Sequence, residues 1–401
     1  MNVTLLAQFF PPETFAGANR IGAMANALAA GADVQVVTLE PSYPDPSAYD
    51  QVDRSSPWID ASVRVRRTRC FVPHGRSWVG RALAEQRMAC GLLLAAAPRR
   101  TDVVIASSPG MFLGPAGLAL ARLQRVPFVW DIRDLTWRYA RERATGGAAA
   151  VTTGVLERSM WAVARHADLL VAATPGIASE LRAARLGTRI VTIGNTVGAE
   201  LLAQLDPSYP AAPARPVVTY AGLVGHAQAL RVLCDVAERL PEIDVHVAGE
   251  GPERVAIVDE ARRRSLRNLV CHGYIQPSEL SVLYRQSDIL FAQLHRSALH
   301  TATALPSKLW EYMAAARPIV YAGDGLAART LRETGAGVAV EPGSADEIVA
   351  AIRNLLADRA GARAMGEVGR RFIEHQPSRQ DELGALLPEL QRLVRGGRRT
   401  P

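Results

Sequence analysis

Short apolar runs rich in β-branched residues alternate with segments of helical period along almost the whole chain of 401 residues. Strands that are apolar throughout belong to sheets covered on both faces, and a helix between consecutive strands makes them parallel. The strands predicted in the first half are Val3–Phe9, Val34–Leu39, Val103–Ser107, Phe128–Asp131, Leu169–Ala173 and Ile190–Ile193. Those predicted in the second half are Val217–Ala221, Val245–Ala248, Leu269–His272, Ile289–Phe291, Ile319–Tyr321 and Val338–Val340. The alternation therefore predicts an α/β protein.

A proline-rich segment separates these two sets of strands. Leu205–Pro216 carries four prolines and little periodicity, which is typical of an interdomain linker. We therefore expect two Rossmann-like domains with parallel sheets that face each other across a cleft: residues 1–205, a linker at 206–216, and residues 217–375. Residues 376–401 are expected to form a C-terminal helix and basic tail that packs back on the N-terminal domain. Ligands of such folds bind at the carboxyl ends of the strands.

Composition excludes several classes of protein. A hydrophobic fraction of 48% with 21% charged residues is ordinary for a globular protein, which argues against disorder. The net charge of +7 comes from arginines in short groups, such as Arg64–Arg69 and Arg262–Arg264, which we expect on helices. No aromatic and basic recognition segment accompanies them, so we predict no nucleic-acid partner, whereas a basic surface could attract anionic lipid head groups.

The chain also shows no signature of export or of a membrane span. The stretch Val103–Ala121 is uncharged but contains turn residues, and Met1–Phe10 lacks the basic start of a signal peptide. The four cysteines are scattered and form no CxxC pair, which suits a reducing cytoplasm and neither a disulfide framework nor a zinc site. We therefore expect a cytoplasmic protein, docked peripherally on the inner face of the cell membrane through its basic N-terminal face.

Lys308 is the only lysine among 46 basic residues, the other 45 being arginine. A compact ammonium and a planar guanidinium are not interchangeable, so Lys308 is a candidate for a site where arginine will not serve. Pro306 and Ser307 predict the start of a helix that continues through Ala315, with Lys308 in its first turn and Glu311 on the same face.

A helix N-terminus attracts anions, so Lys308 would stabilise a leaving diphosphate there, and Glu311 could accept hydrogen bonds from a ribose. The other interpretation is a surface ion pair between Lys308 and Glu311.

Other candidate residues follow predicted strands. Gly17, Gly222 and Gly249 lie in strand-to-helix loops, where a missing side chain lets the backbone approach a phosphate or simply makes a turn. In Asp131–Asp134, Asp131 or Asp134 could be an acceptor-side base and Arg133 an anion contact; an arginine–aspartate pair closing a turn is the alternative.

The chain has no GxSxG, no P-loop, no DxD pair and no histidines at metal-ligand spacing, so we expect no metal.

Segments in both halves resemble retaining GT-B glycosyltransferases of family 4. The C-terminal segments are YAGLVGHAQAL, VAGEGPE, LVCHGYIQPSEL, ALPSKLWEYMAAARPIV and GAGVAVEPGSADEIVAAI. The N-terminal segments are FPPETFAGANRI, DVVIASSPGMFLGPAGLALARLQRVPFVWDIRDL and LERSMWAVARHADLLVAATPGIASEL. The resemblance covers nearly the whole chain and is closest to the branch that transfers acetamido sugars, such as N-acetylfucosamine, in O-antigen and capsule assembly.

The resemblance implies a nucleotide-diphosphate-sugar donor, expected to be UDP-linked, on the C-terminal domain and a glycan or lipid-linked acceptor on the N-terminal domain. It also implies retention at the anomeric carbon and no metal or other cofactor. Glu311 matches the second glutamate of the EX7E motif, which binds the donor ribose. The catalytic residues predicted are Lys308, Asp131 and Arg133. The donor-binding residues predicted are Gly17, Gly222, Gln228, Gly249, Glu250, Tyr274, Ile275, Thr303, Leu305, Lys308 and Glu311.

The sequence departs from the family pattern at several of these positions. Thr303 stands where many members have the first glutamate of EX7E, and Leu223 and Gln228 stand where many carry the arginine and lysine that clamp the diphosphate. Asn195–Gly198 replaces the usual NGVD. These changes leave Lys308 as the principal cation for the phosphates. Two other functions stay open: a sugar-nucleotide epimerase of the same fold and a non-catalytic nucleotide-sugar-binding protein.

Overall fold

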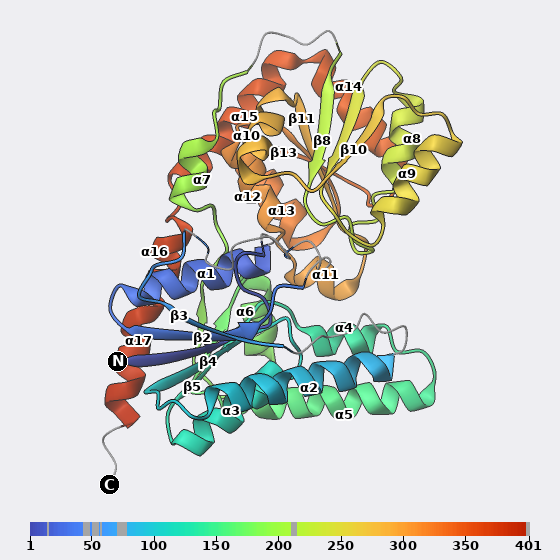
Figure 1. Cartoon of the computed structure of the whole chain (residues 1–401). Coiled ribbons are helices and arrows are strands. Elements are labelled where there is room, and N and C mark those ends of the chain that lie inside the picture. The colour runs from blue at the N-terminus through green and yellow to red at the C-terminus, as the bar shows by residue number, and fades with distance from the viewer. Residues whose placement is uncertain are drawn as a thin grey trace. The chain divides into compact units, whose positions relative to one another are not determined.

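The computed structural model describes residues 1–13, 16–42, 49, 56, 58–69, 78–209 and 215–397 of the chain (Figure 1). These residues form two compact units. The first consists of Met1–Asn195 and Arg379–Pro401, and the second of Thr196–Ser378. No helix among the described residues is both long enough and apolar enough to span a bilayer.

The first unit is built on a parallel sheet, to which the described residues contribute seven strands in the order β3-β2-β1-β4-β5-β6-β7. The strands are β1 (Asn2–Leu6), β2 (Asp33–Leu39), β3 (Arg64–Thr68), β4 (Val103–Ser107), β5 (Phe128–Ile132), β6 (Leu169–Ala172) and β7 (Ile190–Thr192). The helices are α1 (Ala16–Ala29), α2 (Trp78–Ala96), α3 (Leu113–Gln124), α4 (Thr136–Glu142), α5 (Gly147–Arg165), α6 (Pro175–Ala183), α16 (Arg379–Gly384) and α17 (Leu386–Gly397). Figure 1 shows α1 on one side of this sheet and α2, α3 and α5 on the other.

The second unit repeats the plan with six described strands in the order β10-β9-β8-β11-β12-β13. The strands are β8 (Val217–Ala221), β9 (Asp244–Ala248), β10 (Leu269–Gly273), β11 (Ile289–Gln293), β12 (Ile319–Ala322) and β13 (Gly337–Val340). The helices are α7 (Ala199–Gln204), α8 (Val232–Arg239), α9 (Arg254–Arg263), α10 (Pro277–Gln286), α11 (Ala298–Thr303), α12 (Ser307–Ala314), α13 (Gly325–Thr334), α14 (Ala345–Ala357) and α15 (Arg359–Glu374). One core cluster packs α8, α9 and α14 on one face of the sheet, and another packs α10, α12 and α13 on the opposite face.

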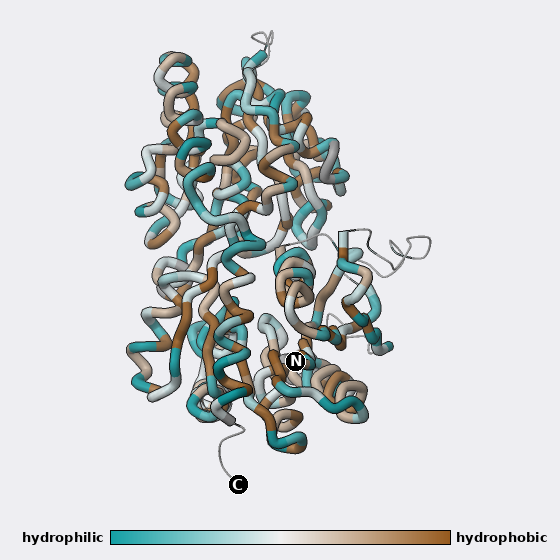
Figure 2. Tube along the Cα trace, turned by 90° about the vertical axis from the view of Figure 1, so that its left-hand side faces the viewer, coloured by the Kyte–Doolittle hydropathy of each residue, from teal (hydrophilic) through white to brown (hydrophobic). Residues whose placement is uncertain are grey.

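Both sheets therefore have a double-wound topology in which the chain changes direction beside the first strand. The switch lies between β1 and β4 in the first unit and between β8 and β11 in the second. Ligands of open parallel sheets bind outside the carboxyl ends of the strands at such a point. Hydrophobic and hydrophilic residues alternate along the helices (Figure 2), as expected of helices with one face packed on a sheet.

The predicted α/β class is confirmed, and each of the twelve predicted strands corresponds to a strand among the described residues. The prediction for Arg64–Arg69 was wrong, because Arg64–Thr68 forms edge strand β3 and not part of a helix. Its side chains are exposed or only partly buried, and Arg64 pairs with Asp33 of β2. A charged edge strand of this kind lacks the apolar run by which the other strands are predicted.

The boundary between the units lies before the predicted position at residue 205. Val197 and Leu205 are buried in the core of the second unit. The Arg370 guanidinium donates a hydrogen bond to the Leu205 carbonyl at 3.0 Å, and that of Arg317 donates to the Pro207 carbonyl at 3.2 Å. The segment that follows Asn195 is thus part of the second unit. Residues 210–214 of the predicted linker and 398–401 of the predicted tail lie outside the described residues.

The C-terminal segment returns to the first unit, in which α16 and α17 lie. Leu383, Leu386 and Leu390 are buried in the core cluster that also contains Met24 and Leu28 of α1. Their burial packs this segment into the core of the first unit. The chain therefore passes from the first unit to the second and then back to the first.

The loops at the carboxyl edge of the second sheet pack too closely for side chains. A Cβ atom at Gly249, where φ is +137°, would overlap the backbone carbonyl of Gly222. Gly343 also has a positive φ, of +79°, but a Cβ there would meet nothing within 4 Å. Alanine at Gly343 would therefore test the free-energy cost of a positive φ alone, whereas alanine at Gly249 would add the cost of a steric clash.

We expect Gly249→Ala to destabilise the protein by roughly 3 kcal/mol or more, because it adds an overlap to an unfavourable backbone conformation. The matched control Gly343→Ala should cost only about 1 kcal/mol, since it carries the conformational term alone. Urea unfolding followed by circular dichroism measures both. Equal unfolding midpoints for the two variants would contradict the close packing of these loops.

Candidate active site

The loops after β8, β9 and β10 form a layered backbone structure at the carboxyl edge of the second sheet. The Gly222 N–H donates to the Ala248 carbonyl at 2.8 Å, and the Gly249 N–H donates to the Gly273 carbonyl at 2.7 Å. The Val224 N–H donates to the Glu250 carbonyl at 2.9 Å. Two predicted site glycines, Gly222 and Gly249, and the predicted site residue Glu250 thus lie at one edge, beside the switch point.

Helix α12 brings Lys308 to this edge. The Lys308 ammonium donates a hydrogen bond to the phenol oxygen of Tyr220, on β8, and Nζ lies 3.8 Å from the centroid of the Tyr220 ring. A Cβ atom at Gly222 would lie 2.9 Å from Nζ. The side chain therefore reaches from the first turn of α12 to a position directly beneath the backbone of Gly222.

The ammonium at this position lacks a carboxylate partner. Among the described residues, Lys308 forms no ion pair, so the surface pair with Glu311 that the sequence also allowed is not present. Burial lowers the pKa of Lys308 to about 7, and the negative charge of Glu311 opposes this shift only in part. A desolvated cation whose nearby carboxylate lies outside ion-pair distance is costly, which makes the position suited to a bound anion.

Glu311 lies one turn further along α12 and is held by another residue. The Tyr284 hydroxyl, on α10, donates to a Glu311 carboxylate oxygen at 3.3 Å. Tyr284 is buried, and burial together with the Glu311 charge raises its pKa well above the ordinary value. The structure thus brings Lys308 and Glu311 to one edge of the second unit, as the helix pattern predicts, but with separate tyrosine partners.

Other predicted donor-binding residues of the second unit serve partly to shape the loops. The Gln228 side-chain oxygen accepts a hydrogen bond from the Gly225 N–H at 3.2 Å, which closes the turn after β8. Glu250 forms an ion pair with Arg254 at 2.9 Å. Tyr274 is 50% exposed at the end of β10, whereas Ile275 packs against the core.

Thr303 is the last residue of α11, and Leu305 lies between α11 and α12. The Thr303 hydroxyl is buried and donates to the Leu299 carbonyl at 2.7 Å. Leu305 is partly buried against the hydrophobic cluster of α10 and α12. Both residues therefore contribute to the packing that positions the start of α12.

The predicted role of Asp131 as a base is not supported by its surroundings in the first unit. Asp131 is fully buried, and its carboxylate accepts from Arg20 of α1 at 2.9 Å and from the Ser107 hydroxyl at 2.7 Å. The Arg20 guanidinium also donates to the Ile193 carbonyl at 3.0 Å. An ion pair satisfied on this many sides has a structural function, and the partner is Arg20 and not the neighbouring Arg133.

Arg133 and Gly17 lie in the same unit. The Arg133 backbone N–H donates to the Ser108 hydroxyl oxygen at 2.7 Å, and burial lowers the pKa of its guanidinium. Gly17 is buried in the first turn of α1. Arg20, three residues further along α1, was not predicted from the sequence, because nothing in its local pattern distinguishes it from the other arginines.

The chemistry of the described residues gives no metal centre. No group of three or more histidine, cysteine, aspartate or glutamate side chains gathers as a metal site among the residues that the structure describes.

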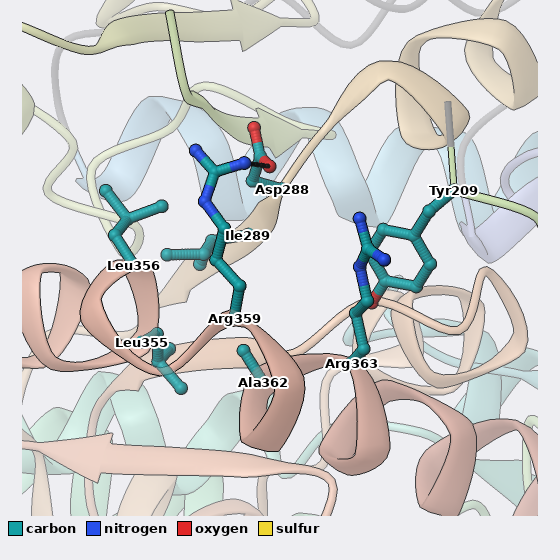
Figure 3. Close-up of a pocket in the computed structure, with 8 residues that line it drawn as sticks. All are labelled: Tyr209, Asp288, Ile289, Leu355, Leu356, Arg359, Ala362 and Arg363. Atoms are coloured by element: carbon teal, nitrogen blue, oxygen red, sulfur yellow. Dashed lines mark ion pairs between the residues drawn. The ribbon is translucent and has the colours of Figure 1, made fainter. Parts of the chain in front are cut away.

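A small pocket in the second unit lies away from this edge (Figure 3). It is lined by Asp288, which precedes β11, and by Arg359 and Arg363 of α15. Arg363 stacks on Tyr209, whose other neighbour is Arg317, with guanidinium-to-ring distances of 4.9 and 4.0 Å. The pocket lies at the amino ends of the strands and anchors the segment after α7, so it does not belong to the candidate site.

The described residues form two double-wound parallel sheets, with a candidate site around Lys308 at the carboxyl edge of the second. Two family profiles match the chain: "Glycosyl transferase 4-like domain" over residues 16–196 and "Glycosyl transferases group 1" over residues 206–372. Together they cover most of both units. The chain therefore consists of a glycosyl transferase 4-like domain followed by a group 1 glycosyl transferase domain, and its fold is GT-B.

Individual relatives are distant. The sulfoquinovosyl transferase SQD2 of Arabidopsis thaliana is 25% identical over 69% of this chain, and the match spans about half, 54%, of that protein. HepE of Anabaena, solved with UDP and glucose, has a TM-score of 0.70 at 15% identity over 98% of this chain and 100% of its own. WaaG, described as a glycosyltransferase involved in lipopolysaccharide biosynthesis, has a TM-score of 0.67 at 14% identity over 98% of this chain and 99% of its own.

Lys308→Met should make stability less dependent on pH. Lysine has an ordinary pKa of 10.5, against about 7 for folded Lys308. Between these values the unfolded chain binds more protons, so the stability of the parent protein rises with pH in that window and falls as pH drops toward 7. The stability advantage of the methionine variant should therefore be largest below about pH 7 and fade toward pH 10.5.

Thermal melts of both proteins between pH 6 and 10.5 measure this difference. The other titrating groups are common to both proteins, so the difference isolates Lys308. A difference in melting temperature that stays constant across the range would show that Lys308 is not buried as a weakly basic amine.

Proposed function

We propose that the protein transfers a sugar from a UDP-sugar to a cell-envelope glycan or lipid-linked acceptor in polysaccharide synthesis, with retention at the anomeric carbon and without a metal. The main support for this proposal is the position of the Lys308 ammonium, which lies next to Gly222 at the carboxyl edge of the second sheet. It forms no ion pair with a carboxylate among the described residues. A diphosphate is the anion that a glycosyltransferase must hold, and a helix N-terminus with an added ammonium suits it.

The proposed step is a displacement on the face from which the diphosphate leaves. The bond between the anomeric carbon and the diphosphate oxygen breaks while the acceptor oxygen bonds to the same carbon. The leaving phosphate oxygen takes the acceptor proton, so no carboxylate nucleophile is required. Lys308 and the N–H groups of the first turn of α12 stabilise the charge that grows on the diphosphate, and positioning supplies the rest.

Glu311 is proposed to bind the donor ribose. Its carboxylate lies one helical turn from Lys308 and is oriented by the Tyr284 hydroxyl. A carboxylate can accept two hydrogen bonds from a vicinal diol. UDP is favoured as the nucleotide because HepE, which shares the fold, was solved with UDP. We propose a hexose or acetamidohexose as the sugar.

Contact with an anionic membrane leaflet is part of this proposal. Leu83 and Leu94 on α2 are 56% and 71% exposed, and Arg87 is exposed between them. Val151 and Val155 on α5 are also exposed, one helical turn apart. Apolar side chains flanked by arginine suit the boundary between lipid head groups and acyl chains. Such a surface would bring the first unit to a lipid-linked acceptor.

The reaction is tested by incubating the protein with UDP- and GDP-sugars and an acceptor fraction from membranes, presented either in anionic vesicles or in detergent. We expect UDP release that depends on the acceptor and is faster with vesicles, and a product that keeps the donor's anomeric configuration by NMR. An inverted product would exclude the retaining mechanism. Donor conversion without acceptor would indicate an epimerase, and UDP-sugar binding without turnover a binding protein.

Lys308→Met should lower kcat/KM by about 100-fold, on the order of 3 kcal/mol of transition-state stabilisation. Lys308→Arg keeps the charge but should rescue little, because the wider guanidinium does not fit between Tyr220 and Gly222. Glu311→Ala should instead raise the UDP dissociation constant. Wild-type turnover in Lys308→Met would remove the lysine from the site, and an unchanged UDP affinity in Glu311→Ala would remove the ribose contact.

A further inference from the structure

The hydrogen-bond partner of Lys308 is a residue that the sequence did not single out. We propose that Tyr220 is a positioning residue that holds the Lys308 ammonium beneath Gly222, where a donor diphosphate can reach it. This inference rests on the proposed function for its ligand. Three observations support it: the orientation of the Tyr220 hydroxyl, the hydrogen bond that Glu311 accepts from Tyr284, and the absence of a side chain at Gly222.

The Tyr220 hydroxyl is oriented so that it accepts a hydrogen bond from Lys308. Tyr220 is fully buried in the core on β8, and its O–H donates to the Leu223 carbonyl at 2.5 Å. Because the hydroxyl proton is used in that bond, an oxygen lone pair faces the Lys308 ammonium. The ring adds a cation–π contact, with Nζ 3.8 Å from its centroid.

Two tyrosine hydroxyls keep Lys308 and Glu311 from neutralising each other. A lysine side chain is flexible, and Glu311 lies three residues along the same helix, where an ion pair could form. Tyr220 holds the ammonium on one side, whereas Tyr284 donates to the Glu311 carboxylate at 3.3 Å. The lysine is therefore not tied to the Glu311 carboxylate, and its protonated form is available to a ligand, which a simple packing role for Tyr220 would not require.

The position beneath Gly222 is open to a ligand because residue 222 has no side chain. A Cβ atom there would lie 2.9 Å from Lys308 Nζ and 3.7 Å from the Tyr220 hydroxyl oxygen. Gly222 is itself exposed. Residue 222 thus places no side chain against the lysine that Tyr220 holds, which leaves room for an anion that approaches this loop.

Two titratable groups among the described residues act on Lys308: Tyr220 on β8, through its hydrogen bond, and Glu311 on α12, through its charge. Tyr284 on α10 and Tyr312 on α12 lie in turn within reach of the Glu311 charge. Burial raises the pKa values of Tyr284 and Tyr312. Lys308, whose pKa burial lowers to about 7, is therefore the basic group in this set that changes charge near neutral pH. Loss of the phenol oxygen removes an acceptor that favours the ammonium, so the Lys308 pKa should fall further.

The chain offers a direct measurement, because Lys308 is its only lysine. Protein labelled with [13Cε]lysine gives one lysine resonance, whose chemical shift can be followed against pH in the full chain without ligand. We expect a midpoint near pH 7 in the parent and a midpoint about one pH unit lower in Tyr220→Phe, the size of shift expected for one charge-assisted hydrogen bond. Tyr321→Phe, at another buried tyrosine of the second unit, is the matched control and should keep the parent midpoint.

Calorimetric UDP titrations of the same proteins separate this inference from the proposed function. The pH at which UDP affinity falls should move downward in Tyr220→Phe by the same amount as the lysine midpoint. If UDP binds but the lysine midpoint is unchanged in Tyr220→Phe, the positioning role is overturned and the proposed function stands. If the midpoint moves but the parent binds no UDP, the positioning role stands and the UDP-dependent function fails.

A measurement on the parent protein covers the case in which Tyr220→Phe does not fold. With tyrosine rings also labelled, the Cε protons of Lys308 should show a nuclear Overhauser contact to a tyrosine ring and an upfield ring-current shift. A lysine resonance with neither feature would overturn the positioning role, because Nζ would then not lie over the Tyr220 ring.

Discussion

An ammonium group held within the second unit without a carboxylate partner is the interaction around which the candidate site is organised. Its hydrogen bond to Tyr220 fixes where the cation lies, and the glycine at residue 222 leaves room for it. Strand β8 supplies Tyr220, the loop that follows it supplies Gly222, and α12 supplies Lys308 and Glu311. Because desolvating a charge is costly, the surrounding structure must either neutralise the lysine or present it to an anion. The tyrosine partners of Lys308 and Glu311 favour the second outcome.

The two units share a strand order but differ in the electrostatics of their switch regions. In the first unit, Arg20 and Asp131 are both fully buried and pair with each other, and Ser107 and backbone carbonyls complete their hydrogen bonds. The charges of Arg20 and Asp131 cancel each other, and the contacts of Arg20 fix α1 to β5 and to Ile193, which follows β7. In the second unit, the corresponding region keeps a lysine that forms no ion pair with any residue that the structure describes. The same topology thus supports a structural ion pair in one unit and the proposed ligand site in the other.

Much of the fold could be predicted from the sequence, because buried parallel strands are apolar along their whole length. Strand β3 escaped prediction since it lies at a sheet edge and carries Arg64 and Arg66 on exposed positions. The position of Lys308 and Glu311 on one helix could likewise be predicted, because it depends on local chain signals. Their partners could not: Tyr220 and Tyr284 are distant in sequence, and only tertiary packing brings them to the charged groups. For the same reason Arg20, and not the adjacent Arg133, is the partner of Asp131.

The most direct test of Lys308 as the diphosphate cation follows its single lysine resonance while UDP is added to the parent protein. A diphosphate bound at the ammonium favours the charged form, so UDP should shift the resonance and raise its titration midpoint well above the ligand-free value of about 7. The shift should saturate with the affinity measured by calorimetry. UDP binding that leaves both the lysine resonance and its midpoint unchanged would contradict the assignment and place the phosphates elsewhere in the protein.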